Sequence, residues 1–482
     1  IMTKIIDKIY LKENLISIIL FILLFSQMII FSISFLQSQF PSENQYLDTY
    51  FNSDRILVMM VAIDIIDNGG SYFDWSLAGP MIIMITIFSI YYWFMGSSVL
   101  TIMLFLITQI TLYMYLAVRL LVINYNLKHA IFIVAIFLTF FINNFEYPYL
   151  QLFIVDGNIM SVIITLFVLV KLLNTKYLET RYFVFLPIII FLTIENVLLL
   201  PQLIIPFIIT QIVIDKQFIK RYYFIYLLII IFSLIGVFIK NKFLPRAHVS
   251  DVVFTFNTFY VGLYHIKEFF LNHSNLLQNL MVIPPLLFIP IIIIQNSPKT
   301  KKIVIHDALI VFYFFSFVFT MISFCITAPN INFRYMQILY FIGPFIFLIK
   351  FKTYFYYKIN SILLLMVLVI INIFTANNFL TIGKKFHYSI YPEYIQELDR
   401  VFEEYNLQVG YCDYWTHLTI PYFSNKNIKM ISIHDNKRSK HNTNRKWFQA
   451  RADFSININP IVFGEKYRKK INIGENNIYI IK

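Results

Sequence analysis

Repeated apolar runs are the feature that most limits what this chain can fold into. A helix of about 17–25 apolar residues matches the roughly 30 Å hydrocarbon core of a bilayer. The chain is 59% hydrophobic and 13% charged, whereas soluble domains have about 25% charged residues. The sequence therefore predicts an all-α polytopic membrane protein. The runs lie at roughly 15–36, 80–95, 97–121, 129–143, 158–173, 182–194, 197–214, 222–239, 277–296, 303–327, 333–350 and 358–376.

Basic residues in the short connections predict the topology, because Lys and Arg gather in cytoplasmic loops. The N-terminus is basic, and so are the connections 119–128, 171–181, 215–221, 297–302 and 350–358. These six basic segments lie on the same side of the membrane only if the run 80–95 does not cross it. That run contains Tyr91-Tyr92-Trp93-Phe94, and such aromatic residues favour the membrane interface. We therefore expect about 11 transmembrane helices, a cytoplasmic N-terminus and an interfacial helix at 80–95.

The composition changes after residue 376, where the apolar runs end. Residues 377–482 contain 16 Lys+Arg and 10 Asp+Glu. The spacing of apolar residues predicts a helix over 393–405, and LQVGYCDYW, IKMISI, PIVFG, INIG and NIYIIK are typical of short strands. The sequence predicts a transmembrane domain at 1–376 and a small extracytoplasmic α/β domain at 377–482.

The net charge of +13 fits the basic loops of a membrane protein. Nucleic acid is not an expected partner, because no basic stretch is dense and interleaved with aromatic residues. The sequence contains no Gly-rich phosphate loop, no GxSxG, no HExxH and no paired CxxC. These absences argue against soluble-nucleotide chemistry on the cytoplasmic side.

The interval 37–80 is unusually acidic for such a chain and is expected to form the first outer loop. Asp54, in FNSDR, is the first candidate for a catalytic residue, because a carboxylate there could take a proton from an acceptor hydroxyl. A solvated loop acid would look the same in the sequence. Asp48 has the same surroundings and is the second candidate. The acids of the interval are Glu43, Asp48, Asp54, Asp64, Asp67 and Asp74, against one base, Arg55.

Other acids and one tryptophan are candidates for substrate binding. Asp74 and Trp75 follow a Gly-rich turn signal; they either cap a turn and anchor the interface, or contact a lipid or sugar ring. Glu146 and Asp156 lie in the second expected outer loop. Asp156 either caps the next helix or joins a second carboxylate in binding a divalent cation or a sugar hydroxyl.

Cations are few on the expected outer side. Arg246 lies in LPRAHVSD, and Arg334 lies in TAPNINFRYMQ at the start of an apolar run. Arg334 could hold a lipid phosphate with two hydrogen bonds. The same residue could instead extend to lipid headgroups from a span that contacts no substrate.

This layout resembles the GT-C superfamily of membrane glycosyltransferases. NSD…DNGGSYFDW is similar to the first loop of a related group of bacterial membrane proteins, and VGYCDYW and KWF are similar to its terminal domain. The resemblance implies a catalytic Asp at Asp54 and a second-loop acid at Asp156 or Glu146. It also implies a basic residue on a lipid phosphate, best matched by Arg334, and leaves a divalent cation as a candidate cofactor.

We therefore expect an integral membrane glycosyltransferase of the bacterial cytoplasmic membrane. It would move a sugar from a polyprenyl-phosphate donor to an outer-surface glycan or lipid acceptor. One alternative is a lipid-linked glycan transporter or flippase, which predicts polar residues at mid-span depth and two related halves. The other is an O-antigen-type polymerase or ligase, a class that usually relies on outer-side arginines and a large late outer loop.

Overall fold

The computed structural model describes two well-defined regions of the chain, one helical and one α/β. The longer described stretches are residues 53–77, 81–96, 99–122, 199–214, 216–243, 256–273, 305–327, 393–414, 416–434, 436–439, 443–473 and 476–481. Shorter pieces lie between 125 and 134, at 162–167, between 190 and 194, between 339 and 346 and between 366 and 373, with single residues at 22 and 391.

The expectation of about 11 transmembrane helices is wrong. Among the described residues, one helix is long and apolar enough to cross a bilayer, judged by length and composition: the segment Leu309–Ile326, half of which is buried within the protein. Apolar runs also supply a protein's own core. The segment Leu200–Thr210, in a run that we expected to cross, is too short to span; so is Ile82–Met95, in the run 80–95 that we expected not to cross. Most of the other runs that we expected to cross lie wholly or largely outside the described residues.

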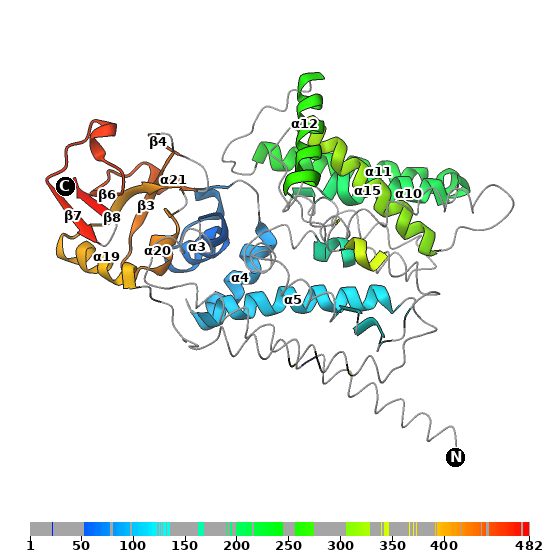
Figure 1. Ribbon diagram of the computed structural model, residues 1–482, viewed down its shortest axis with the longest axis horizontal. Helices are drawn as coiled ribbons and strands as arrows, with labels where there is room; N and C mark the ends of the chain where they lie inside the picture. The colour runs from blue at the N-terminus through cyan, green and yellow to red at the C-terminus, as the bar shows by residue number, and fades with distance from the viewer. Residues whose placement is uncertain are drawn as a thin grey trace, which may run out of the picture.

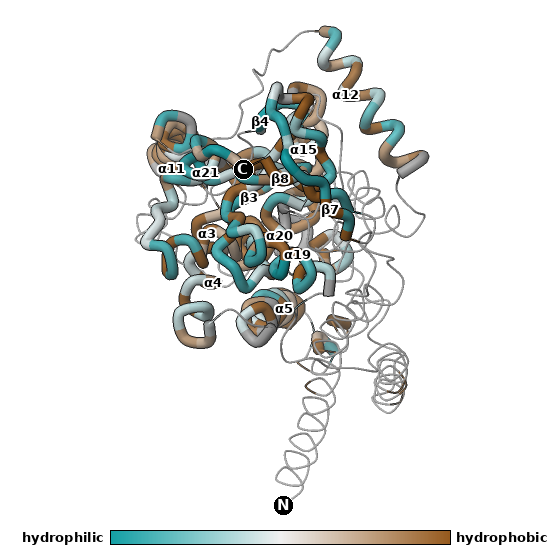
Figure 2. Tube along the Cα trace, turned by 90° about the vertical axis from the view of Figure 1, so that its left-hand side faces the viewer, coloured by the Kyte–Doolittle hydropathy of each residue, from teal (hydrophilic) through white to brown (hydrophobic). Residues whose placement is uncertain are grey.

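Helices α10, α11, α12 and α15 lie on the side of the molecule away from the sheet, whereas α3 lies beside it (Figure 1). Helix α15 packs against α10, α12 and η2. Figure 2 shows α12 standing apart from the C-terminal sheet. The elements are α3 (Ser53–Asp67), η1 (Tyr72–Asp74), α4 (Ile82–Met95), α5 (Val99–Leu121), η2 (Leu200–Ile204), α10 (Ile205–Ile214), α11 (Lys216–Phe243), α12 (Phe256–Glu268), η3 (Phe269–His273) and α15 (Ile305–Thr327).

Helix α3 occupies 15 residues, about a third, of the interval 37–80 that we expected to be an acidic outer loop. Residues Ile56–Ala62 are almost completely buried, because the interval contains the apolar stretch ILVMMVA between its acids. Helix α4 follows, contains no charged residue and ends at Gly96, whose positive φ of 73° suits glycine. Helix α4 packs against both α3 and α5.

The C-terminal region is an α/β unit built on a six-stranded mixed sheet. The strand order is β4-β3-β2-β6-β8-β7. β2 is parallel to both β3 and β6, and the other pairs are antiparallel. β7 at one edge is largely hydrophilic (Figure 2). The elements are α19 (Glu393–Glu404), β2 (Val409–Asp413), α20 (Thr419–Phe423), β3 (Lys429–His434), β4 (Lys437–Arg438), β5 (Thr443–Asn444), α21 (Arg445–Phe448), β6 (Phe454–Ile456), η5 (Pro460–Phe463), β7 (Lys469–Ile473) and β8 (Asn476–Ile480).

One element of the unit differs from its sequence pattern. PIVFG forms the 3-10 helix η5, where we expected a strand. Asn459 caps it by accepting a hydrogen bond from the Ile461 amide, and Gly464 ends it at a φ of 74°. A Pro at the first helical position, preceded by Asn and followed by Gly, favours a short helix over a strand.

The two regions share one hydrophobic core. Leu57 and Val58 of α3 belong to the same contiguous cluster as Leu398 and Phe402 of α19. Helix α20 contacts α3, and the two-residue strand β1 (Trp75–Ser76) pairs antiparallel with β5 of the α/β unit. The 71–77 segment is therefore held between the helices and the sheet.

Gln109 of α5 gives a test of this packing. Its side chain is fully buried, and neither its amide nitrogen nor its amide oxygen has a hydrogen-bond partner among the residues that the structure describes. A buried polar group without a partner costs roughly 1–3 kcal/mol. We expect Gln109→Leu to raise the midpoint of thermal unfolding of the purified protein. Gln449→Leu, at an exposed position, should change it little, and a lower midpoint for Gln109→Leu would contradict the packing described.

Candidate functional site beside helices α3 and α4

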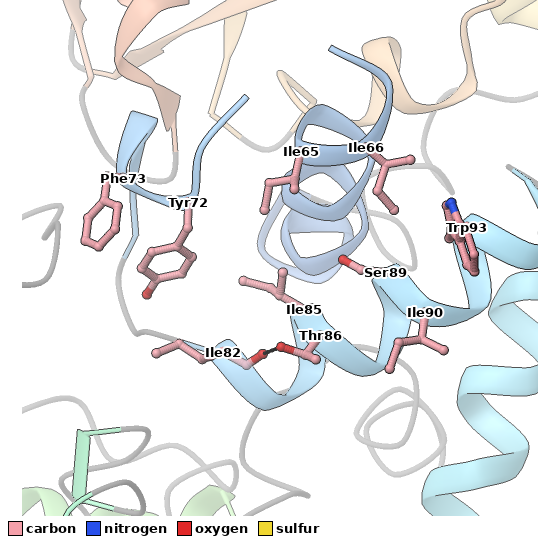
Figure 3. Close-up of a pocket in the computed structure, with 10 residues that line it drawn as sticks. All are labelled: Ile65, Ile66, Tyr72, Phe73, Ile82, Ile85, Thr86, Ser89, Ile90 and Trp93. Atoms are coloured by element: carbon pink, nitrogen blue, oxygen red, sulfur yellow. Dashed lines mark hydrogen bonds between the residues drawn. The ribbon is translucent and has the colours of Figure 1, made fainter. Parts of the chain in front are cut away.

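A pocket of about 520 Å³ lies between α3, η1 and α4. We call it the α3–α4 groove. Figure 3 shows α4 running across it beneath the C-terminal end of α3, with the η1 side chains at one end and Trp93 at the other. Its lining residues, most of them apolar, are Ile65, Ile66, Tyr72, Phe73, Ile82, Ile85, Thr86, Ser89, Ile90 and Trp93.

The rim of the groove carries exposed apolar side chains. Phe73 is 59% exposed and Trp93 69% exposed, and Ile90 lies half-exposed between them along the wall. Phe94 stacks edge-on against Trp93 with ring centroids 4.7 Å apart and is also exposed. Large apolar groups gathered at one surface opening indicate a binding surface for an apolar partner.

Few polar atoms line the groove. The Thr86 hydroxyl donates to the Ile82 carbonyl of its own helix at 2.8 Å. The Ser89 hydroxyl points toward the space between α3 and α4 (Figure 3). The groove therefore suits a hydrocarbon chain better than a sugar, which would need many hydrogen-bond partners.

The two ends of the groove carry different charges. At the Trp93 end, Asp67 follows the lining residue Ile66, and the Tyr92 hydroxyl donates to its carboxylate. At the η1 end, Asp74 follows the lining residue Phe73 and forms an ion pair with Lys446 of α21, with Nζ and Oδ2 2.7 Å apart. One end is thus acidic, and the other contains a cation supplied by the α/β unit.

Asp74 also shapes η1. The Ser71 backbone amide donates to Asp74 Oδ2 at 2.9 Å, and the Ser71 hydroxyl accepts from the Phe73 amide at 3.2 Å. The hydrogen bond from Lys446 and the one from the Ser71 amide lower the pKa of Asp74 below its ordinary value of 3.8. Because a lowered pKa means that the charged form is favoured in the folded state, this contribution to stability is present at neutral pH. It is lost only as the pH falls below 3.8.

A buried carboxylate joins the groove to the α/β unit. Asp64 is 4% exposed and accepts three hydrogen bonds from side chains. The Trp75 indole nitrogen and the Asn444 amide nitrogen each lie 2.9 Å from Oδ2, and the Asn68 amide nitrogen lies 3.2 Å from Oδ1. Gly70 lies so close that a Cβ there would come within 2.5 Å of Oδ2. Position 70 therefore needs a residue without a side chain so that the turn can close over this carboxylate.

The same node lies at the carboxyl ends of the parallel strands, where doubly wound sheets bind ligands. β2 and its neighbour β6 are parallel, and the chain leaves β2 toward β3 on one side and β6 toward β7 and β8 on the other. After β2 the chain reaches His417, whose Nε2 lies 3.4 Å from the Thr443 hydroxyl. Thr443 pairs with Ser76 in the β1–β5 ladder. The η1–β1 segment therefore lies beside the chain that follows the carboxyl end of β2.

Two of the candidates from the sequence lie at this site in different roles. Trp75 is fully buried, with its ring 5.3 Å from that of Trp447. It therefore cannot stack on a lipid or sugar ring in this structure, and our expectation of such a contact is corrected. Asp74 both caps η1 and lies beside the groove, so its two interpretations are not exclusive.

The remaining candidates are less well placed. Asp54 lies in the first turn of α3, and its side chain is outside the described part. It is eleven residues from Ile65, or about 16 Å along the helix axis. The candidates that lie outside the described residues are Asp48, Glu146, Asp156, Arg246 and Arg334.

No metal site stands out in the described ranges. Among those residues, no group of three or more His, Cys, Asp or Glu is placed to hold a metal ion. The divalent cation stays a prediction that depends on acids outside them.

The sequence analysis missed Asn444 and Lys446. Asn444 meets Asp64 across 380 residues of chain, and Lys446 meets Asp74 across 372. No local spacing predicts a contact over that distance. The only signals were the KWF motif in the C-terminal region and the acids of the 37–80 interval, which we considered separately.

Comparisons with known proteins add no neighbour. No family model, no curated protein and no solved structure matched this chain.

The Asp64 node predicts a sharp loss of stability when its carboxylate is removed. Asp64→Leu leaves the Trp75 indole N–H and the Asn444 amide N–H buried without an acceptor, and each such group costs roughly 1–3 kcal/mol. We expect a lower thermal midpoint and a red-shifted tryptophan emission as Trp75 and Trp447 become exposed. Glu397→Leu, which removes an exposed carboxylate on α19, should leave both unchanged. Equal behaviour of the two variants would contradict this role.

Proposed function

We propose that the protein is a membrane-integral glycosyltransferase whose lipid-linked substrate lies with its apolar chain in the α3–α4 groove. The observation that carries the proposal is the groove itself, an apolar pocket of about 520 Å³ with exposed aromatic residues at its rim. Proteins bind a hydrocarbon chain in concave, largely apolar sites of this size. The donor that we propose is a polyprenyl-phosphate-linked sugar, because the sequence resembles the GT-C superfamily.

The membrane setting is part of the proposal. Helix α15 contains the segment Leu309–Ile326, whose length and composition suit a bilayer, and we propose that it anchors the chain. Helix α4 carries no charge over its fourteen residues and exposes Trp93 and Phe94. Aromatic side chains of this kind favour the boundary between headgroups and acyl chains. A groove that opens beside them would receive a lipid directly from the membrane.

The same arrangement supports a proposal for the side of the membrane on which transfer takes place. The α/β unit packs against α3 and η1, so a head group that emerges from the η1 end meets its carboxyl edge. We propose that this edge faces the extracytoplasmic side, where a glycan or lipid acceptor would be reached. Asp54 is the base that the resemblance assigns. A substrate that engages both Asp54 and the groove must extend along α3.

Lipid binding tests the groove. Ser89→Trp places an indole in the groove, and we expect it to reduce binding of a polyprenyl phosphate to the detergent-solubilised protein at least about tenfold, because the chain and the indole compete for one volume. Leu112→Trp, on an exposed position of α5, is the matched control and should bind normally. Native mass spectrometry gives the bound fraction. Normal binding by Ser89→Trp would exclude the groove as the site of the chain.

Transfer activity tests the chemistry separately. We expect Asp54→Asn to abolish release of polyprenyl phosphate from labelled polyprenyl-phosphate sugars, because an amide cannot take the acceptor's proton. Lipid binding and the thermal midpoint should stay unchanged, which separates loss of the base from loss of folding. Full activity of this variant would remove Asp54 from the mechanism. Activity in Ser89→Trp would contradict the groove while leaving the reaction intact.

A further inference from the structure

Helix α21 places two consecutive exposed cations beside the η1 end of the groove. Arg445 and Lys446 are both exposed, and their helix is held on either side. Asn444 caps it by accepting a hydrogen bond from the Lys446 amide at 2.9 Å, while its own side-chain amide donates to Asp64. Trp447 is buried against Trp75. Asn444 and Trp447 therefore fix the position of α21 beside η1, and this position does not depend on the charges of Arg445 and Lys446.

The carboxylates at that end leave both cations exposed to solvent. Asp74 is the acid that meets Lys446 directly, and Arg445 lies close enough to act on the same carboxylate. The buried carboxylate of Asp64 also acts on Lys446, but its oxygens accept hydrogen bonds from Trp75, Asn444 and Asn68 and it is 4% exposed. The Lys446 side chain remains 69% exposed despite the ion pair, and an exposed ion pair of this kind contributes little to stability. Both cations therefore remain accessible to an anion.

The opposite end of the groove has the reverse character. Asp67 lies there, exposed, with its carboxylate held by Tyr92. A lipid with an anionic head would be repelled from Asp67 and attracted toward Arg445 and Lys446. The charges at the two ends thus favour one orientation of an anionic lipid in the groove, whereas apolar walls alone would favour neither orientation.

We infer that the lipid in the groove carries a phosphate-type head group, and that Arg445 and Lys446 of the C-terminal α/β unit bind it. The inference rests on the proposed function, because it assumes that the groove holds the chain. Arg can give a phosphate two parallel hydrogen bonds, and Lys provides a point charge beside them. Lys446 would exchange its contact with Asp74 for one with the phosphate. The binding site is then complete only when the α/β unit is docked on η1.

Two lipids of equal chain length distinguish binding of the head group from binding of the chain. The probes are a polyprenyl phosphate and the corresponding polyprenol, each titrated against the full-length protein in detergent. We expect Lys446→Met and Arg445→Met each to weaken binding of the phosphate about tenfold, the equivalent of about 1.4 kcal/mol, and to leave binding of the alcohol unchanged. Lys437→Met, which removes an exposed cation from β4, should bind both as the unmodified protein does.

A second variant acts in the opposite direction. Asp74→Asn removes the anion that competes with the phosphate for Lys446, so it should tighten binding of the phosphate. Because Asp74 also caps η1, Ser71→Ala serves as the control that weakens the cap without changing charge. If the Asp74–Lys446 pair were only a structural contact, Asp74→Asn and Lys446→Met would change binding in the same direction, and the inference would be overturned.

The outcomes also distinguish this inference from the proposed function. Equal affinity for phosphate and alcohol, unaffected by Lys446→Met but lost in Ser89→Trp, would overturn the head-group assignment and keep the groove. Failure of both lipids to bind, or normal binding in Ser89→Trp, would overturn the groove itself. Inorganic phosphate that displaces the lipid at equal concentration would show a site for a free anion, and would also overturn the assignment.

Discussion

The buried carboxylate of Asp64 is the interaction on which the arrangement of this protein depends. An ion in the protein interior is costly unless hydrogen bonds replace its water, and Asp64 accepts three, from Trp75, Asn444 and Asn68. These donors come from the end of α3, the β1 strand and the α/β unit. Removing any one would leave the buried carboxylate with fewer hydrogen bonds in place of its water, so the node holds the three segments in one geometry.

The groove and its charged end follow from that geometry. With Trp75 drawn inward, its neighbours Phe73 and Asp74 face outward, one toward the groove and the other toward α21. Asn444 both binds Asp64 and caps α21, so the same residue that closes the core also places Lys446. The groove, with a cation at one end and Asp67 at the other, is thus formed by α3, η1 and α4 together with α21 of the α/β unit.

The α/β unit contributes to the site through its sheet topology. β2 lies between two parallel neighbours, and the carboxyl edge beside such a strand is where doubly wound sheets receive ligands. Here that edge packs on α3 and β1, so a polar ligand would be shared between the sheet and the helices. The proposed lipid-linked substrate has the matching form, an apolar chain for the groove and a polar head for the sheet edge.

Local patterns in the sequence determined much of the secondary structure and little of its assembly. The apolar, uncharged stretch 82–95 favours a helix, and the segments LQVGYCDYW and IKMISI are typical of short strands; the structure has α4, β2 and β3 there. Counting apolar runs as membrane spans failed, because periodicity records that a face is buried and does not say whether lipid or protein covers it. The tertiary structure alone decided that Asp64 is buried and that Trp75 faces inward. It also decided that Lys446 meets Asp74, because contacts across 372 and 380 residues depend on how the chain packs and leave no trace in local spacing.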